Sequence, residues 1–357
     1  MATVGMNDKT GRPIRVWALL GPHRGDNNQV LSLAEALGLP FEEKWLHYNH
    51  LRRLQPALLG ATLKSVAANV RSQLEGEPPD LTISTGHRSV PVVRALKKRS
   101  GGRMRAVHLG YPRISPKHFD LVVPTPEYPV PDAPNVVRIP FALSPLTKAA
   151  TDPDELAPLL DFPRPRRLFV LGGPTLYWEL PERQMLAALR RLIEIAERGG
   201  GSVLAIGSPR TPQHLLNAVA EELGRAKVDA FIAPREGRPS YRAMIEAADQ
   251  IHVTADSVAM VADAVNTRKP VGIVPISKSW LGRIVMATAD RIRPRKRLFP
   301  RDLRFFWAAL EEHGFGGTID VPLASDPPDF TAEIAGRIRR LLELPPQPAT
   351  ADRGSAR

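Results

Sequence analysis

The chain has 357 residues, a formal net charge of +12 and no cysteine. This length favours two domains, and the absence of cysteine excludes disulfides, thiolate metal sites and cysteine nucleophiles, which fits a reducing cytoplasm. No apolar run reaches the roughly 18–20 residues that a membrane span requires, and the first residues lack a signal-peptide pattern, so we expect a cytoplasmic protein.

The excess of basic residues is compatible with nucleic acid, an anionic membrane surface or a phosphorylated substrate as partner. The sequence contains no nucleic-acid-binding motif and no zinc finger, so we expect no nucleic-acid partner. Two basic segments with apolar neighbours, residues 51–63 and 283–304, could contact an anionic membrane peripherally at its cytoplasmic face. The plain alternative is that the leucines are core residues and the basic residues form a solvated surface.

The first part of the chain alternates predicted strands and helices. Residues 15–21 predict a buried strand, and the apolar spacing after it predicts a helix that ends before Gly38. A longer helical region is expected over residues 51–74. The remaining predicted elements are a helix over residues 90–98 and strands over residues 81–84, 107–109, 121–124 and 136–139.

A segment rich in Pro, Asp and Ala interrupts this pattern at residues 144–165. We therefore expect an N-terminal, acceptor-side domain over residues 1–145, a linker over residues 146–166 and a C-terminal, donor-side domain over residues 167–344. The polar tail, residues 345–357, is expected to be disordered.

The second part repeats the alternation, and residues 251–274 are its clearest unit, a strand, a helix that Ser257 can cap, and a second strand. The other predicted elements are strands over residues 167–171 and 202–206 and helices over residues 182–197, 213–223 and 330–344. The two halves predict an α/β protein with two Rossmann-like, doubly wound domains facing a cleft, which is a GT-B-like arrangement. Ligands of such sheets bind at the carboxyl ends of the strands.

Three strand-to-helix turns of the second half carry residues suited to a nucleotide diphosphate. A glycine pair lets the backbone approach a ligand closely, Arg210 can bind phosphates in a bidentate manner, and the helix N-terminus at Ser257 can hold an anion. Asp263, six residues into that helix, can accept hydrogen bonds from ribose hydroxyls. Tight turns and helix caps, including a cap at Thr211, are the structural alternative. The predicted donor nucleotide-binding residues are Gly172, Gly173, Ser208, Arg210, Thr211, Asp256, Ser257 and Asp263.

Small, basic and acidic residues also follow the first and third predicted strands of the first half. His87 and Asp26 are the candidate catalytic bases, because a histidine or a carboxylate at a strand end can accept a proton from a substrate hydroxyl. A loop and a helix cap would use the same residues. The predicted acceptor or cleft residues are Gly21, Arg24, Gly25, Gln29 and Gly86.

No motif indicates a resident metal ion or cofactor. The sequence lacks a GxxxxGK[ST] P-loop, a GxGxxG fingerprint and an HExxH pair, so we expect no cofactor and no metal site. Asp152-Pro153-Asp154 matches the DxD metal motif of one glycosyltransferase superfamily, but it lies in a Pro-bearing linker rather than at a strand end, which favours coincidence.

Several motifs resemble those of the mitochondrial fission ELM family, in the same order along residues 15–274. They include GDNNQVLSLAEALG, PDLTISTGHRSVP, SPRT and VTADSVAMVADAVNTRKPV. Bacterial members of this family are usually described as glycosyltransferases. More remotely, FVLGGP and VTADSVAMVADAVNTRKPVGIVP resemble GT-B glycosyltransferases such as the enzyme that adds N-acetylglucosamine to form lipid II. This resemblance implies that Asp263 takes the place of the acid that binds the ribose.

We therefore expect a metal-independent GT-B enzyme that transfers a sugar from a nucleotide diphosphate sugar to an unknown acceptor, either lipid-linked or from the cell envelope. Helix N-termini and Arg210 would stabilise the departing diphosphate in place of a metal ion. A nucleotide-sugar epimerase is the enzymatic alternative. The resemblance also implies a second alternative, a non-catalytic membrane-associated interaction protein like the eukaryotic mitochondrial-fission relatives.

Overall fold

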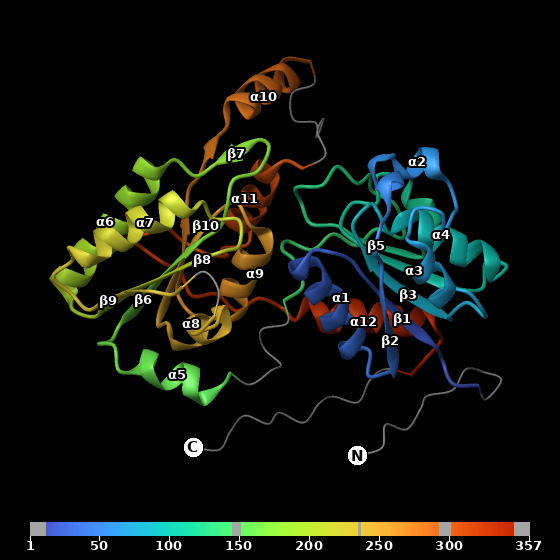
Figure 1. The fold of residues 1–357 in the computed structure, drawn as a ribbon, viewed down its shortest axis with the longest axis horizontal. Coiled ribbons are helices and arrows are strands. Elements are labelled where there is room, and N and C mark those ends of the chain that lie inside the picture. Colours follow the sequence, from blue (N-terminus) through green and yellow to red (C-terminus); the bar gives the residue numbers. More distant parts are fainter. Residues whose placement is uncertain (1–11, 145–150, 235–236, 293–300, 346–357) are drawn as a thin grey trace. The chain divides into compact units, whose positions relative to one another are not determined.

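The computed structural model describes residues 12–144, 151–234, 237–292 and 301–345 (Figure 1). The chain forms two compact units. Unit 1 contains the residues up to Ile139 and those from Asp329 onward, and unit 2 contains Pro140–Pro328. The tail that the sequence predicts to be disordered lies outside the described residues from position 346 on.

Unit 1 is built on a parallel sheet of five strands in the order β2-β1-β3-β4-β5. Strand β1 is buried along its whole length, which explains its continuous apolar sequence. Residues 136–139, predicted as a strand, contribute only an isolated bridge between Val136 and Val122. The strands are β1 Val16–Leu20, β2 Phe41–Trp45, β3 Leu81–Thr85, β4 Arg105–Leu109 and β5 Leu121–Val123.

The helices of unit 1 cover both faces of this sheet. Because parallel connections are right-handed and the strand order reverses after β2, α1 and α4 lie on opposite faces. The helix predicted over residues 51–74 is wrong, since Pro56 begins a short helix there and Gly60, with φ of +66°, ends it. The helices are α1 Arg24–Ala36, η1 His50–Arg53, α2 Pro56–Leu59, α3 Ala68–Gln73, α4 Val90–Arg99, η2 Pro116–His118 and α12 Phe330–Leu341.

The last helix, α12, returns to unit 1 and packs beside α1. Its buried Arg339 donates a hydrogen bond from Nη1 to the carbonyl oxygen of Leu37, 2.7 Å away, at the end of α1. This contact satisfies an otherwise orphaned carbonyl at a helix C-terminus. The second domain expected from the sequence included residues 329–344, whereas the structure groups them with unit 1.

Unit 2 is built on a second parallel sheet of five strands, in the order β11-β10-β6-β8-β9. All six residues of β6, at the centre of the sheet, are buried. A separate antiparallel pair joins two short strands. The strands are β6 Arg166–Leu171, β7 Trp178–Glu179, β8 Ser202–Gly207, β9 Ala230–Ile232, β10 Gln250–Thr254, β11 Val271–Val274 and β12 Ser277–Lys278.

The helices of unit 2 also cover both faces, with α6 and α7 on one side of the sheet and α8 and α9 on the other (Figure 1). In α6, the buried residues Met185, Leu189, Leu192 and Ala196 recur every three or four positions, so one face of the helix meets the core. The helices are α5 Pro153–Leu160, α6 Glu182–Gly199, α7 Gln213–Gly224, α8 Tyr241–Ala247, α9 Val258–Asn266, α10 Trp280–Ile292 and α11 Leu303–Glu312.

Part of the expected linker is helical and belongs to unit 2. Helix α5 packs against α8, and its cap Asp152 accepts a hydrogen bond from the amide of Asp154 at 3.0 Å. Asp152 also pairs with Arg238 at 3.0 Å. The DxD-like tripeptide is therefore a helix cap. Across the described ranges, none of the helices combines the length and apolar content needed to cross a membrane.

Candidate functional site

Three turns of unit 2 meet at the carboxyl edge of its sheet. Strands β10, β6 and β8 are neighbours and parallel, so the turns that follow them lie side by side. The turn after β6 holds the glycine pair, the turn after β8 holds residues 208–211, and the turn after β10 holds Asp256 and Ser257. The predicted donor residues other than Asp263 are thus brought to one place.

Asp256 connects these turns. Its fully buried carboxylate accepts hydrogen bonds from the backbone amide of Gly173 at 2.9 Å and from the Thr254 hydroxyl at 2.7 Å. The Thr254 hydroxyl in turn accepts from the amide of Gly172 at 2.8 Å. Because the carboxylate is enclosed, it acts on the geometry of the turns and does not itself face solvent.

The same carboxylate holds Arg210. One Nη of the guanidinium lies 3.1 Å from Asp256 Oδ2, and the other donates to the carbonyl oxygen of Gly173 at 3.2 Å. The Arg210 side chain remains 46% exposed. The guanidinium is therefore fixed on one side and open to solvent on the other, as a ready anion-binding group would be.

The two glycines are required by close packing. A Cβ at Gly172 would collide with the carboxylate of Asp256. A Cβ at Gly173 would lie 2.5 Å from the backbone oxygen of Arg210 and 2.6 Å from its carbonyl carbon. Side chains at either position would push the turns apart, so only glycine allows the three turns to meet this closely.

Thr211 has a different role from the helix cap that the sequence predicts. Helix α7 begins after Pro212, and no side chain caps it. The buried Thr211 hydroxyl instead lies 2.6 Å from the carbonyl oxygen of Gly172 and accepts from the amide of Ser208 at 2.8 Å. Thr211 thus ties the turn after β8 to the end of β6, and the cap prediction is wrong.

The helix after β10 begins as predicted. The Ser257 side chain accepts a hydrogen bond from the amide of Met260 at 3.4 Å, which caps α9. The preceding turn is anchored by Trp307, whose indole N–H donates to the carbonyl oxygen of Ala255 at 2.9 Å. Since the first amides of a helix lack partners within it, the start of α9 carries partial positive charge at this edge.

Asp263 lies away from this network, on the same helix. Its Oδ1 accepts a 2.6 Å hydrogen bond from the hydroxyl of Ser144, and Tyr241 lies beside the carboxyl group. Burial is the main cause that raises the pKa of Asp263 to about 7, while the hydrogen bonds from Ser144 and Tyr241 oppose the shift. The carboxyl group therefore keeps its proton to a much higher pH than an ordinary aspartic acid does.

The corresponding edge of unit 1 carries the predicted acceptor residues. Gly21 ends β1, and the buried Asn27 closes this turn, accepting from the Gly21 amide and donating to its carbonyl oxygen, both at 2.8 Å. The stretch predicted as a loop is mostly helical, because α1 begins at Arg24. The predicted residues in its first two turns are Arg24, Gly25, Asp26 and Gln29.

His87 follows β3, the strand beside β1, so the two turns lie at the same edge. Gly86, with φ of +70°, makes the turn between strand and histidine. Burial, followed by the charges of Arg113 and Arg88, lowers the pKa of His87 to about 4. His87 is therefore neutral at pH 7 and can accept a proton, although weakly.

Several residues that contribute to these sites were not predicted from the sequence. Thr254, Ser144 and Tyr241 each contact a predicted residue, and Trp307 contacts Ala255, the neighbour of Asp256. Except for Thr254, these residues are distant in sequence from their partners. Asn27 was not predicted either, but its role could have been found from the sequence. It lies inside the GDNNQ motif, and an Asn near a helix start often bonds the preceding turn.

The family model described as mitochondrial fission ELM1 matches residues 24–342. Mitochondrial fission protein ELM1 of Arabidopsis thaliana is 25% identical over 318 residues, which cover 80% of this chain and 69% of that protein.

Two solved structures are similar to this chain. UDP-GlcNAc 2-epimerase from Methanocaldococcus jannaschii superposes with a TM-score of 0.53 at 13% identity, covering 92% of this chain and 99% of that one. MurG from Acinetobacter baumannii superposes with a TM-score of 0.45 at 13% identity, covering 92% of this chain and 100% of that one. The first likeness confirms the predicted fold class, an α/β protein of GT-B type with two Rossmann-like parallel sheets. By its sequence, the chain belongs to the mitochondrial fission ELM1 family.

Proposed function

We propose that the protein binds a nucleotide diphosphate sugar at the carboxyl edge of the unit 2 sheet and transfers the sugar to an acceptor hydroxyl. The observation that carries this proposal is Arg210, which the buried Asp256 holds in place while leaving its outer side exposed. An arginine fixed in this way loses little conformational entropy when it binds an anion.

The chemistry would be substitution at the anomeric carbon, with the nucleoside diphosphate as leaving group. Negative charge builds on the departing diphosphate, and the Arg210 guanidinium and the first amides of α9 would stabilise it. Ser208, which is half-buried in the same turn as Arg210, would donate a further hydrogen bond to the diphosphate. These groups would supply the charge that a metal ion supplies in other glycosyltransferases.

The acceptor would lie at the carboxyl edge of the unit 1 sheet, near Gly21 and Gly86. His87 or Asp26 would accept the proton of its hydroxyl group as the new glycosidic bond forms. His87 is neutral at pH 7 and so is in the protonation state that a base requires. A lipid-linked acceptor would bring the protein into peripheral contact with an anionic membrane.

Two other functions share parts of this proposal. An epimerase would bind the same nucleotide sugar and change its stereochemistry without an acceptor. A non-catalytic interaction protein is favoured by the family itself, because the Arabidopsis relative is a mitochondrial fission protein. The non-catalytic function does not require nucleotide binding, whereas both enzymatic functions do.

A thermal-shift screen with nucleoside diphosphates and nucleotide sugars separates these functions. A ligand at about 100 times its dissociation constant should raise the free energy of unfolding by about 2.7 kcal/mol. A nucleotide sugar that gives a shift is then incubated with the protein, with and without candidate acceptors, and the products are analysed. Free nucleoside diphosphate with a glycosylated acceptor supports transfer, a changed sugar without acceptor supports epimerisation, and no shift with any nucleotide contradicts the proposed function.

A further inference from the structure

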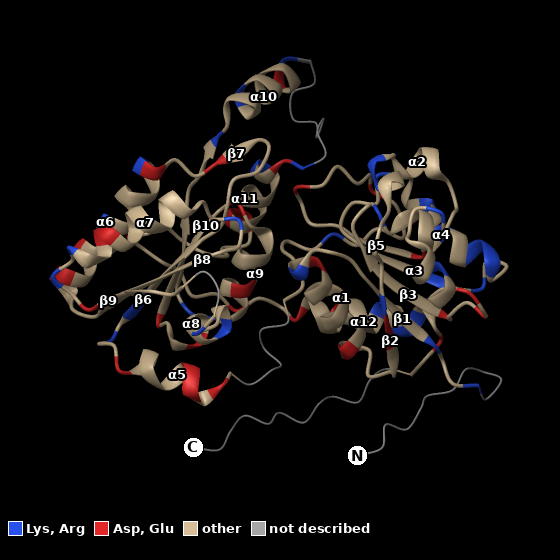
Figure 2. Ribbon diagram, in the orientation of Figure 1, with Lys and Arg blue, Asp and Glu red and all other residues tan. Residues whose placement is uncertain are grey.

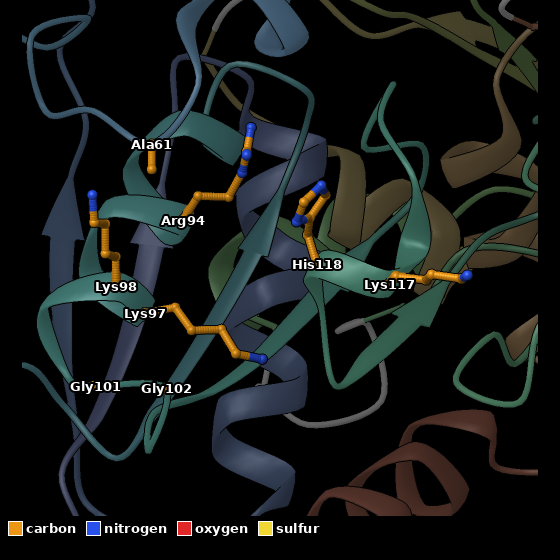
Figure 3. A pocket seen from close by; sticks show the side chains of 8 residues that line it. All are labelled: Ala61, Arg94, Lys97, Lys98, Gly101, Gly102, Lys117 and His118. Carbon is orange, nitrogen blue, oxygen red and sulfur yellow. The ribbon is translucent and has the colours of Figure 1, made fainter.

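A basic pocket of about 500 Å³ opens on unit 1, beside α4 (Figure 3). The charged side chains come from two elements, α4 and the short helix η2. In Figure 3 the Arg94 and His118 side chains reach into the same space. The residues that line it are Ala61, Arg94, Lys97, Lys98, Gly101, Gly102, Lys117 and His118.

The pocket is separate from the edge that carries His87 and Gly21. Helix α4 starts at the carboxyl end of β3 and runs back, so its last residues, Lys97 and Lys98, lie toward the amino ends of the strands. Helix η2 precedes β5 and therefore lies toward the same end. An acceptor at the carboxyl edge would not occupy this pocket.

The charges of the pocket are poorly balanced by acids. Lys97 pairs with Asp120 at 2.5 Å, and Asp120 is shared with Arg105. Within the part of the chain that the structure describes, no ion pair involves Arg94, Lys98 or Lys117. Burial, followed by the charges of Arg94 and Lys97, lowers the pKa of His118. A phosphate group would relieve this repulsion and could accept several charge-assisted hydrogen bonds at once.

The segment that carries two exposed leucines reaches the pocket at Ala61, which is one of its lining residues. Helix α2 contacts α4, and the amide of Thr62 bonds the carbonyl oxygen of Pro91 in α4 at 3.1 Å. Leu58, on α2, is 77% exposed, and Leu54 just before it is 45% exposed. Exposed leucines beside basic side chains are typical of segments that lie in the boundary between lipid headgroups and acyl chains. Figure 2 shows Lys and Arg residues of α4 in blue.

We propose that this surface docks on an anionic phospholipid membrane, with a lipid phosphate in the pocket and Leu54 and Leu58 among the upper acyl chains. The leucines favour a lipid over a free phosphorylated metabolite, because a small soluble ligand would leave them in water. This inference locates the membrane contact of the proposed function, and it does not depend on nucleotide binding or sugar transfer.

Co-sedimentation with vesicles tests the docking surface. Wild-type protein should bind vesicles of phosphatidylcholine with phosphatidylglycerol, bind pure phosphatidylcholine weakly, and be released by salt well above about 0.15 M. Lys98→Glu should lower the vesicle partition coefficient at least about five-fold, the effect expected for one basic residue at an anionic surface. Leu58→Ser should lower it too. Lys227→Glu, an exposed lysine of unit 2, is the control with the same charge change.

Inorganic pyrophosphate, titrated by calorimetry, distinguishes a lipid from a soluble ligand. The proposal expects Leu58→Ser to weaken vesicle binding and to leave any pyrophosphate binding unchanged. It is overturned if Lys227→Glu reduces vesicle binding as much as Lys98→Glu, or if the wild type does not sediment with anionic vesicles. It is also overturned if Lys98→Glu affects pyrophosphate alone. Nucleotide-induced thermal shifts should be equal in Lys98→Glu and wild type, so failure here leaves the proposed function untouched.

Discussion

The two carboxyl edges of this protein are organised differently. In unit 2, one buried carboxylate, Asp256, bonds the turn after β6 and the side chain of Arg210 from the turn after β8. In unit 1, the side chain of the buried Asn27 bonds the Gly21 turn that it follows. A Cβ at Gly173 would meet backbone atoms, whereas a Cβ at Gly21 would meet nothing within 4 Å. The comparison shows that the turns of unit 2 are held closely together, whereas unit 1 keeps room at its edge.

The strongest test of this difference exchanges glycine for alanine in each unit. Gly173→Ala should lower the free energy of unfolding by about 3 kcal/mol, because its Cβ would force the backbone of Arg210 away. Gly21→Ala should change it by less than about 1 kcal/mol, since the space there is open. Urea denaturation measures both. Equal effects of the two substitutions would mean that the edges are equally packed.

The buried carboxyl group of Asp263, in unit 2, predicts that the free energy of unfolding depends on pH. Its pKa of about 7 in the folded protein exceeds the ordinary 3.8, so ionisation costs more in the folded state than in the unfolded state. Stability should therefore fall as pH rises from about 4 to about 7, by roughly 2–4 kcal/mol, and stay level above.

Asp263→Asn isolates this contribution, because an amide oxygen still accepts from Ser144 but does not ionise. The difference in free energy of unfolding between variant and wild type should grow from pH 4 to pH 8 in favour of the variant. Parallel profiles across this range would show that Asp263 has an ordinary pKa.

A smaller effect on the free energy of unfolding is expected when the carboxylate of Asp256 is replaced by a neutral amide. In Asp256→Asn, one carboxylate oxygen becomes an NH₂ group that faces either the Gly173 amide or the Thr254 hydroxyl, both of which donate to it in the wild type. The buried mismatch should cost about 1–3 kcal/mol. Asp26→Asn, in the first turn of α1, is the comparison in unit 1. If the two substitutions cost the same, Asp256 does not organise the turns.

The sequence predicted most of the sheets and some of the site. Strands β1, β3, β6, β8 and β10 are mostly buried and centre on apolar residues, and their alternation with helices indicated two parallel sheets. The edge strands β2 and β9 were missed. The sequence of β2, FEEKW, has polar residues in place of an apolar run, and β9 has only three residues, all of intermediate exposure. The meeting of the three turns in unit 2 followed from the rule that parallel strands share a carboxyl edge.

What could not be predicted depends on contacts between distant positions. Ser144 and Asp263 are 119 positions apart in the sequence, so their hydrogen bond could not be predicted from it. The packing of α12 against α1 could not be predicted from the sequence of either helix. An apolar face shows that a helix packs against something, but it does not show which element it packs against. The basic pocket was missed because Lys97 and Lys117 belong to different elements and are brought together only by the fold.

The central claim, that Arg210 at the carboxyl edge of the unit 2 sheet binds a diphosphate, is tested most directly by calorimetric titration of UDP and uridine. Wild-type protein should bind UDP, and Arg210→Ala should weaken UDP binding about 10- to 100-fold, the loss of one or two charge-assisted hydrogen bonds. Affinity for uridine should be the same in both proteins. Equal losses for UDP and uridine, or no binding of UDP to the wild type, would contradict the account.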